Sequence, residues 1–280
     1  MRVASVGGRA ALVRGDTYID IAAASDGRFS ADPARMYDDW PALVAWAESQ
    51  PEAGAPLPKA ALGCPAPMPR QVFALAVNYR DHAAEASIAP PEHPLVFTKF
   101  PTSICGPFTD IELTSNRADW EVELVVVIGR EAWRVPEADA WRHVAGLTVG
   151  QDVSERRMQF RKPFPHLSIA KSLATFGPIG PVVVTPDELD DPDALRLTCA
   201  VNGELMQDGS TRDLLFPVAR LISEISAAVR MLPGDLIFTG TPAGTGSTRD
   251  PRRYLAPGDV VESWIEGIGT MRNTCVEAAA

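Results

Sequence analysis

Acidic residues at the ends of two apolar segments are the side chains best placed to do chemistry in this chain. Glu121 and Glu123 lead into the run 122–128, which is almost entirely aliphatic and β-branched and is predicted to be a strand buried on both faces. Because side chains alternate along a strand, both glutamates should share one face with Asp119. Carboxylates that lead into a buried strand are costly unless they are paired or bind a cation.

A third acid, Asp152, strengthens the prediction of a metal site. An isolated Glu-x-Glu is more often exposed or paired with arginine, since carboxylates are rarely buried. Asp152, however, follows a second strand-like run at 145–149, so three acids lie at the ends of two apolar segments. Three carboxylates suit Mg²⁺ or Mn²⁺ and leave positions open for substrate oxygens. Histidine and cysteine are scarce nearby, which disfavours zinc.

His82 and Glu85 are a candidate base and its partner. Three residues separate them, so they would meet across one helical turn. The unperturbed pKa of histidine, about 6.5, suits a group that takes a proton from water. Glu85 could orient the imidazole and stabilise its charged form. The same spacing is common by chance on exposed helices, so it becomes informative only together with other motifs.

The composition excludes several classes of function. The chain has 280 residues, of which 46% are hydrophobic and 22% charged, as in ordinary globular proteins. The net charge of −10 disfavours nucleic-acid binding, and no strand is followed by the G-x-G-x-x-G of dinucleotide-binding proteins. No apolar run approaches the roughly 20 residues of a membrane-spanning helix, and no secretory signal opens the chain. A cytoplasmic protein without a membrane partner is therefore expected.

Residues 1–66 are predicted to form a small N-terminal domain. Glycine-containing turns separate three strand-like runs, at 2–6, 10–13 and 18–21. A helix is expected over 39–49, with Asp39 as its N-cap. A stretch rich in proline, alanine and glycine, 51–69, is the candidate linker. The main domain then covers 67–280.

The main domain is predicted to be rich in β-structure. It opens with an apolar strand at 71–77, and Asp81 is expected to cap a short helix that ends at Ala86. Further strand-like runs lie at 95–98, 121–128, 145–149, 181–185, 197–202, 235–239 and 259–265. One clear helix, 217–231, has apolar residues at helical spacing. Because few helices alternate with the strands, the pattern favours an α+β, β-rich fold over a doubly wound parallel sheet.

Six segments of the main domain resemble, in order and spacing, the motifs of the fumarylacetoacetate hydrolase superfamily. The segments are NYRDHAAE at 78–85, FTKFPTS at 97–103, DWEVE at 119–123, DVSER at 152–156, KS at 171–172 and GDLIFTGTPAGTG at 234–246. The resemblance runs from about Phe73 to Gly269. That superfamily includes acylpyruvate and fumarylpyruvate hydrolases, oxaloacetate decarboxylases, and related hydratases and isomerases.

The resemblance implies a mixed β-roll with a small N-terminal domain, usually assembled as a homodimer. It implies that Glu121, Glu123 and Asp152 bind Mg²⁺ or Mn²⁺. It also implies that His82 and Glu85 form the water-activating pair of the hydrolases.

Four further residues are expected near the substrate. Lys171 and Thr241 match family positions there, and Lys99 lies within a matching motif. Arg156 matches a less certain position, for which a structural ion pair is equally consistent. Thr241 belongs to a glycine-rich loop, 240–246, which lacks the lysine of a phosphate-binding loop and is expected to offer N–H groups and hydroxyls to a substrate carboxylate.

The predicted activity is metal-dependent hydrolysis of a carbon–carbon bond in a small β-diketo acid of acylpyruvate or fumarylpyruvate type. A dication would act as a Lewis acid on the leaving enolate, and Lys171 would add positive charge there. Decarboxylation of an oxaloacetate-type acid, hydration of a dienoate, or isomerisation of a 2-oxo acid would use the same metal. A metal-stabilised scaffold without catalysis is a further alternative. The His82–Glu85 pair favours hydrolysis.

The segment around Lys171 departs from the family pattern. Many relatives carry glycine before this lysine and Phe-Asp after the following serine, whereas this chain has Ala170 and then Leu173-Ala174. His166 stands where glutamine is frequent. These departures concern substrate contacts, so the acyl group of the substrate is left open.

Overall fold

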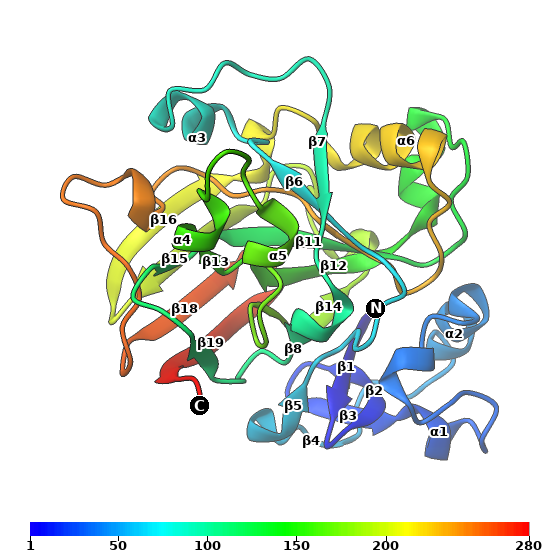
Figure 1. The fold of residues 1–280 in the computed structure, drawn as a ribbon. Coiled ribbons are helices and arrows are strands. Elements are labelled where there is room, and N and C mark those ends of the chain that lie inside the picture. Colours follow the sequence, from blue (N-terminus) through cyan, green and yellow to red (C-terminus); the bar gives the residue numbers. More distant parts are fainter. Residues whose placement is uncertain (280) are drawn as a thin grey trace.

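Two large β-sheets carry most of the chain in this computed structural model, which describes residues 1–279 (Figure 1). The larger sheet has twelve strands: β1 (Arg2–Val6), β2 (Arg9–Arg14), β3 (Thr17–Asp20), β4 (Ala55–Pro56), β5 (Leu62–Gly63), β6 (Val72–Ala76), β7 (Leu95–Thr98), β8 (Ile104–Cys105), β11 (Val122–Ile128), β12 (Val144–Gln151), β14 (Gly177–Val184) and β17 (Leu236–Phe238). Its order is β4-β3-β2-β1-β14-β12-β11-β17-β6-β7, with β5 paired to β1 and β8 to β14.

The smaller sheet has five strands in the order β16-β15-β18-β19-β9. These are β9 (Ile111–Leu113), β15 (Arg196–Val201), β16 (Glu204–Ser210), β18 (Val260–Ile265) and β19 (Gly269–Glu277). Two short strands, β10 (Ala118–Asp119) and β13 (Ser154–Glu155), pair separately. Parallel pairs, such as β17 with β6 and β19 with β9, occur among mostly antiparallel ones. The predicted β-rich α+β fold with mixed sheets is confirmed.

Among residues 1–279, six short α-helices lie around the sheets (Figure 1). They are α1 (Ile21–Ala24), α2 (Trp40–Ala47), α3 (Arg80–Glu85), α4 (Arg156–Gln159), α5 (Leu167–Ala170) and α6 (Val218–Ala228). None of the helices within residues 1–279 is long and apolar enough to span a bilayer. The predicted cap of α2 is confirmed, because the Asp39 carboxylate accepts a hydrogen bond from the Ala42 N–H at 3.4 Å.

Strand β11 lies near the centre of the larger sheet, and all seven of its residues are buried. Val122, Leu124, Val126 and Ile128 belong to the core cluster that also contains residues of the smaller sheet. Val125 and Val127 belong to a second cluster, which contains residues of β1, β2 and α2. Each such side chain contributes about 1.5–3 kcal/mol on full burial. Both faces of β11 are therefore fixed, and its register positions the acids at its start.

The N-terminal region continues the larger sheet. Strand β1 pairs antiparallel with β14 through Arg2 and Val3, so the start of β1 is joined to the main domain. The stretch 51–69, predicted as a linker, is held by two short strands: β4 pairs with β3, and β5 pairs with β1. The division of the chain at residue 66 stays a prediction.

The predicted capping role of Asp81 is wrong. Helix α3 begins at Arg80 after Tyr79, whose side chain makes no capping hydrogen bond. Asp81 lies in the first turn, and its carboxylate accepts hydrogen bonds from the His82 N–H at 2.7 Å and the Ala243 N–H at 3.2 Å. A contact with a loop far along the chain thus replaces the local cap, and it ties α3 to that loop.

Helix α6 is shorter than the predicted 217–231. It ends at Ala228 because Val229 adopts an extended conformation, with φ of −128° and ψ of 130°. Two residues later, Met231 forms an antiparallel bridge with Ala132. The apolar spacing continues past Ala228, but these residues pack as extended chain.

Candidate active site

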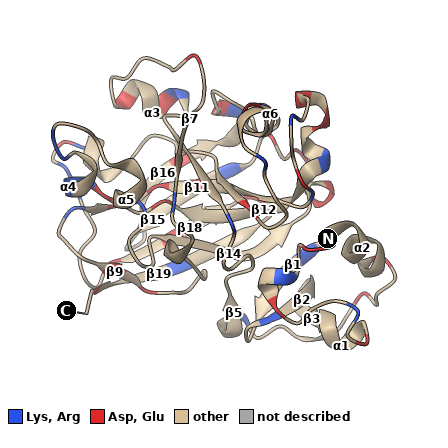
Figure 2. Cartoon of the chain, turned by 45° about the vertical axis from the view of Figure 1, so that its right-hand side comes forward, with Lys and Arg blue, Asp and Glu red and all other residues tan. Residues whose placement is uncertain are grey.

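The three predicted metal ligands meet beside the central strands of the larger sheet. One carboxylate oxygen from each of Glu121, Glu123 and Asp152 lies within 4.8 Å of those of the other two. Strands β11 and β12 bring them together because Val122 pairs with Gln151 in antiparallel register. The Asp152 N–H donates to the Glu121 carbonyl at 2.9 Å, and the Glu121 N–H donates to Gln151 Oε1 at 2.8 Å. In Figure 2, which colours Asp and Glu red, red segments lie near the β11 label.

Two buried lysines contact this acidic trio. Lys171 Nζ donates to Glu121 Oε2 at 2.5 Å and to Asp152 Oδ2 at 2.6 Å. Burial lowers the pKa of Lys171, but Asp152 and Glu121 outweigh burial and raise it above the usual value. Lys99 Nζ donates to Asp152 Oδ1 at 2.7 Å and to the carbonyls of Lys171 and Phe176. All three ammonium hydrogens of Lys99 thus have acceptors within the protein, so Lys99 orients Asp152.

Arg156 orients Glu121 in the same way. Its guanidinium donates to Glu121 Oε1 at 2.6 Å, to Asp119 Oδ2 at 2.8 Å and to Gln159 Oε1 at 2.8 Å. Burial raises the pKa of Glu121, but the charges of Lys171 and Arg156, followed by His82, outweigh it and lower that pKa to about 2. Glu121 is therefore ionised at neutral pH. The ion pair considered for Arg156 is present, and a substrate contact by this residue stays a prediction.

Glu123 is the acid of the trio with the least compensation. Its one hydrogen-bond partner among residues 1–279 is the Gly240 N–H, which donates at 2.7 Å. Burial, followed by the charges of Asp152 and Glu121, raises its pKa well above the usual value. With Asp119 included, four buried carboxylates face Lys99, Lys171 and Arg156, which leaves one uncompensated negative charge when all are ionised.

The trio fits a hard dication. Its donors are all carboxylate oxygens on two hydrogen-bonded strands, and one of them, on Glu123, lacks a cationic partner. Such a donor set is the kind that Mg²⁺ and Mn²⁺ prefer. Glu121, Glu123 and Asp152 would hold the ion, while Lys99, Lys171 and Arg156 fix the orientation of two of these ligands.

His82 and Glu85 lie on α3 as predicted, with His82 Nδ1 and Glu85 Oε2 3.6 Å apart. That nitrogen is buried and has no hydrogen-bond partner among the described residues. Apo active sites often show catalytic contacts that are longer than a hydrogen bond. Burial raises the pKa of Glu85, but the nearby imidazole of His82 and the hydrogen bond from the Gly244 N–H outweigh burial and lower that pKa. Glu85 is therefore an anion beside the imidazole.

The glycine-rich loop surrounds the site, but internal acids use several of its N–H groups. Glu123 accepts from Gly240, Glu85 from Gly244, and Asp119 from Gly246 and Ser247. The loop thus already binds carboxylates, as its sequence suggested, although these belong to the protein.

Thr241 lies inside this loop and is buried. Its hydroxyl donates to the Val122 carbonyl at 2.8 Å and accepts from Gln207 Nε2 at 2.8 Å. In this arrangement it fixes the loop to the start of β11, and a contact with substrate stays a prediction.

Gln207 is a positioning residue that sequence reasoning missed. Its Oε1 accepts from the Val122 N–H at 3.0 Å, and its Nε2 donates to Thr241 Oγ1 and to the Pro242 carbonyl, each at 2.8 Å. One buried side chain therefore joins the metal-ligand strand to the loop. No sequence signal marks it, because the segment around it reads as a polar hairpin.

Comparisons with known proteins match most of the chain. The family model described as fumarylacetoacetate (FAA) hydrolase C-terminal matches residues 71–276. The chain is 42% identical over 214 residues to oxaloacetate tautomerase FAHD2A, mitochondrial, of Homo sapiens, a match that covers 76% of this chain and 68% of that protein.

Solved structures match over the full length of the chain. A putative HpcE protein from Mycobacterium smegmatis is 49% identical, with a TM-score of 0.95 and complete coverage of both chains. Maleylpyruvate hydrolase from Sphingobium sp. SYK-6, in complex with manganese(II) ion and pyruvate, is 29% identical, with a TM-score of 0.83 and complete coverage of both.

Proposed function

This chain belongs to the fumarylacetoacetate hydrolase superfamily, and we propose that it is a Mg²⁺- or Mn²⁺-dependent enzyme that moves a proton on carbon 3 of a small 2-oxo acid. That proton transfer interconverts the keto and enol forms of the acid. The observation that carries the proposal is the buried trio of Glu121, Glu123 and Asp152, in which Glu123 has no cationic partner among residues 1–279, together with the His82–Glu85 pair.

Each residue of the site has a role in this reaction. A bound dication would supply Lewis-acid charge to the oxygens of the 2-oxo acid. Lys171 keeps its positive charge in the site, where it favours the oxyanion that forms as carbon 3 loses its proton. The imidazole of His82 accepts and returns that proton through Nε2, the ring nitrogen that does not face Glu85. Glu85 is ionised and lies 3.6 Å from Nδ1, where it stabilises the imidazolium.

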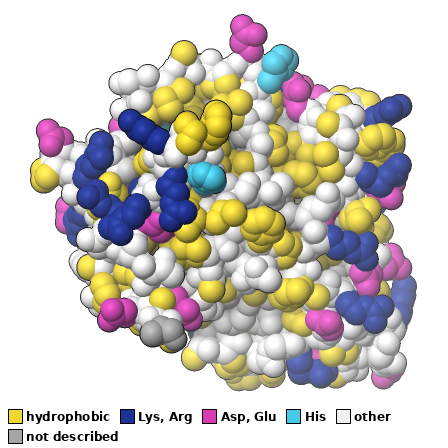
Figure 3. Space-filling model, viewed as in Figure 1, with side chains coloured by type: hydrophobic (Ala, Val, Ile, Leu, Met, Phe, Trp, Pro, Cys, Tyr) yellow, Lys and Arg dark blue, Asp and Glu magenta, His cyan; other side chains and the backbone are white. Residues whose placement is uncertain are grey.

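The surface around the site favours an acidic substrate despite the net charge of −10. Figure 3 shows lysine and arginine side chains gathered over α4. Arg157, Arg161 and Lys162 are exposed in and just after that helix. A local cluster of one sign attracts a diffusing anion even when the whole protein repels it.

Hydrolysis of a β-diketo acid is the second candidate. The same His82–Glu85 pair could take a proton from water, and the sequence alone favoured that use. Relatives are named for both reactions: one is an oxaloacetate tautomerase and another is a maleylpyruvate hydrolase. Hydrolysis has one more requirement than tautomerisation, because the site must bind a water molecule as well as transfer a proton. Decarboxylation requires neither His82 nor the water.

A substrate panel separates these reactions. Metal-free protein would be incubated with oxaloacetate, acetylpyruvate and maleylpyruvate, with and without Mg²⁺ or Mn²⁺, while the enol absorbance is followed and products are identified by mass. We expect metal-dependent keto–enol conversion of oxaloacetate without loss of mass. Metal-dependent release of pyruvate and a second acid would support hydrolysis, and carbon dioxide from oxaloacetate would support decarboxylation. No metal-dependent change in any of the three would contradict the proposal.

Further expectations stay predictions. We propose that Lys99 and Arg156 act by holding Asp152 and Glu121, and that Thr241 acts through its loop, rather than all three contacting the substrate directly. A homodimer and a cytoplasmic location are also expected, the first to be checked by light scattering and the second by fractionation of cells.

A further inference from the structure

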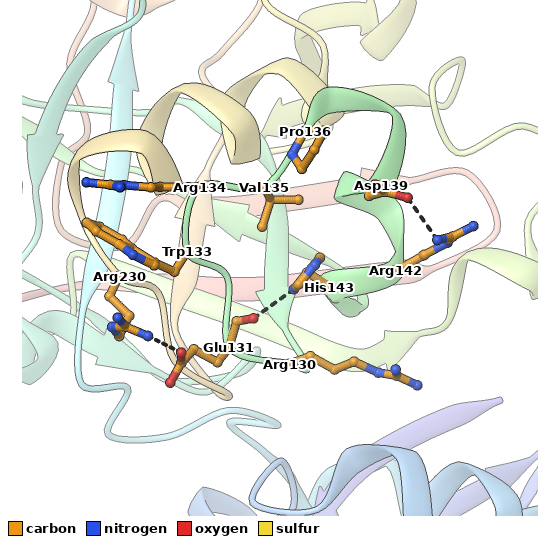
Figure 4. Close-up of a pocket in the computed structure, with 10 residues that line it drawn as sticks. All are labelled: Arg130, Glu131, Trp133, Arg134, Val135, Pro136, Asp139, Arg142, His143 and Arg230. Atoms are coloured by element: carbon orange, nitrogen blue, oxygen red, sulfur yellow. Dashed lines mark hydrogen bonds and ion pairs between the residues drawn. The ribbon is translucent and has the colours of Figure 1, made fainter.

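A basic pocket lies at the far end of the strand that carries the metal ligands. Strand β11 begins next to Glu121 and ends at Ile128, and the residues that follow it line a pocket of about 480 Å³ (Figure 4). Four arginines take part in the lining: Arg130, Arg134, Arg142 and Arg230. Four guanidiniums in one hollow are notable in a chain with a net charge of −10.

Only two carboxylates of the pocket compensate these four charges. Asp139 pairs with Arg142 at 2.8 Å, and Glu131 pairs with Arg230. Within residues 1–279, no carboxylate oxygen lies within 4.0 Å of a side-chain nitrogen of Arg130 or Arg134. The pocket therefore carries a surplus of two positive charges, which matches a ligand with two negative charges.

The guanidiniums of Arg134 and Arg230 are held in place before any ligand arrives. Each lies 5.0 Å from the centre of the Trp133 ring, and Figure 4 shows the indole between them. Stacking on an aromatic ring restricts a guanidinium while leaving its N–H groups free to donate in the plane. Because arginines flank the indole, it is not available to stack a nucleobase, so the pocket favours an oxyanion over a nucleotide base.

Backbone and side-chain bonds also make the frame of the pocket rigid. The Arg134 N–H donates to the Ser226 carbonyl at 2.9 Å, and the Val135 N–H donates to Ser226 Oγ at 3.0 Å. His143 Nδ1 lies 2.8 Å from the Glu131 carbonyl and must donate to it, since that oxygen can only accept. Helix α6 and the 3₁₀ turn at 137–143 thus hold the arginine-bearing segment between them.

We propose that this pocket binds a small oxyanion with two or more negative charges, of the diphosphate or polycarboxylate type. Six residues, most of them in β11, lie between Glu123 and Arg130, and an extended chain of this length spans roughly 20 Å. The pocket is thus a second binding site, distinct from the metal centre. Its size and concave shape suit a small molecule, and bidentate donation by planar guanidiniums suits both phosphate and carboxylate oxygens.

Calorimetric titration tests the proposal. The full chain, freed of divalent metal so that neither probe is chelated, would be titrated with inorganic pyrophosphate and, separately, with citrate. The test variant is Arg130→Gln with Arg134→Gln. The matched control is Arg28→Gln with Arg252→Gln, which removes the same charge from two exposed arginines elsewhere, one of them stacked on Phe29. Arg130→Gln alone is a second test variant that keeps the stacking on Trp133.

We expect saturable one-to-one binding of at least one probe. Each lost charge-assisted hydrogen bond should weaken it about tenfold, while the control pair changes it less than about twofold. Binding of pyrophosphate alone would assign a phosphate ligand, and binding of citrate alone a polycarboxylate. The proposal is overturned if neither probe saturates at millimolar concentration, or if the test and control variants lose affinity equally.

Discussion

Replacing Glu123 with glutamine should have opposite effects on stability and on metal binding. Glu123 is buried beside two other carboxylates, and the ligand oxygens of the trio lie within 4.8 Å of one another. At that separation two like charges repel by about 3–4 kcal/mol at an effective dielectric constant of about 20. Glutamine removes this repulsion but keeps an oxygen that can accept from the Gly240 N–H, as Glu123 Oε2 does.

The lysines and Arg156 already offset part of the repulsion, so the net effect is smaller than the pairwise figure. We expect Glu123→Gln to raise the free energy of unfolding of the metal-free protein by about 1–3 kcal/mol. Affinity for Mn²⁺ should fall by more than about 100-fold, because changes to outer partners of a metal ligand already cost 10–100-fold.

Urea unfolding without divalent metal and calorimetric titration with Mn²⁺ would measure the two effects on one protein preparation. Glu262→Gln is the control, since Glu262 is a partly exposed acid on β18, away from the trio. The reasoning is refuted if metal-free Glu123→Gln is less stable than the wild type and binds Mn²⁺ equally well. Glu123 would then be a satisfied structural acid.

Four further substitutions test individual contacts, each by urea unfolding. Lys99→Met should lower the free energy of unfolding by about 3–5 kcal/mol, because it leaves a buried carboxylate oxygen without its cation; an unchanged midpoint would contradict this. Gln207→Leu should lower the free energy of unfolding by about 2–4 kcal/mol, because the buried Val122 N–H and Pro242 carbonyl lose their hydrogen-bond partner. Turnover should fall as well. Gly146→Ala should lower the free energy of unfolding by about 1–3 kcal/mol, since a Cβ there would lie 2.6 Å from a backbone oxygen of the neighbouring strand. Unchanged stability would show that this strand can shift to make room for the methyl group. A hydrogen bond from Arg9 lowers the pKa of Asp20. Asp20→Asn should therefore lower the free energy of unfolding slightly at pH 7, but not at a pH below that at which Asp20 is protonated in the folded protein. An equal loss of stability at both pH values would exclude the ion pair as the cause.

Local patterns in the sequence were sufficient to predict much of the fold and the three candidate metal ligands. The run 122–128 combines β-branched residues with complete burial, so its strand and the shared face of Glu121 and Glu123 were both predictable. Asp39 precedes a proline in the first turn of its helix, a combination that marks a helix start. In each case the residues that decide the structure are neighbours in the chain.

Strands that depend on distant partners were less predictable. Strand β19 was not expected because Asn273 interrupts its apolar alternation, although Asn273 is buried and donates to the carbonyls of Pro107 and Thr109. The helix at α3 was expected, but its cap was misassigned, since Asp81 accepts from a loop 162 residues away.

The positioning residues of the site show the same limit. Lys99 contacts Asp152 across 53 residues, and Gln207 contacts Val122 across 85. The family motif placed Lys99 near the substrate, but no local pattern shows that it holds Asp152. No local pattern distinguishes Gln207 from an exposed glutamine, because both roles follow from burial that only the folded sheets create. The sequence therefore indicated which residues could do chemistry, whereas the positioning roles of Lys99 and Arg156, and Gln207 itself, became visible only in the folded structure.

Proton exchange at carbon 3 tests the central claim most directly. Pyruvate or 2-oxobutyrate would be incubated in D₂O with the wild type and with His82→Ala, with Mg²⁺ or with chelator, and the loss of the carbon-3 proton signal followed by NMR. The account predicts exchange only in the wild type with Mg²⁺, while His82→Ala still binds the metal. Equal exchange without metal, or in His82→Ala, would contradict it.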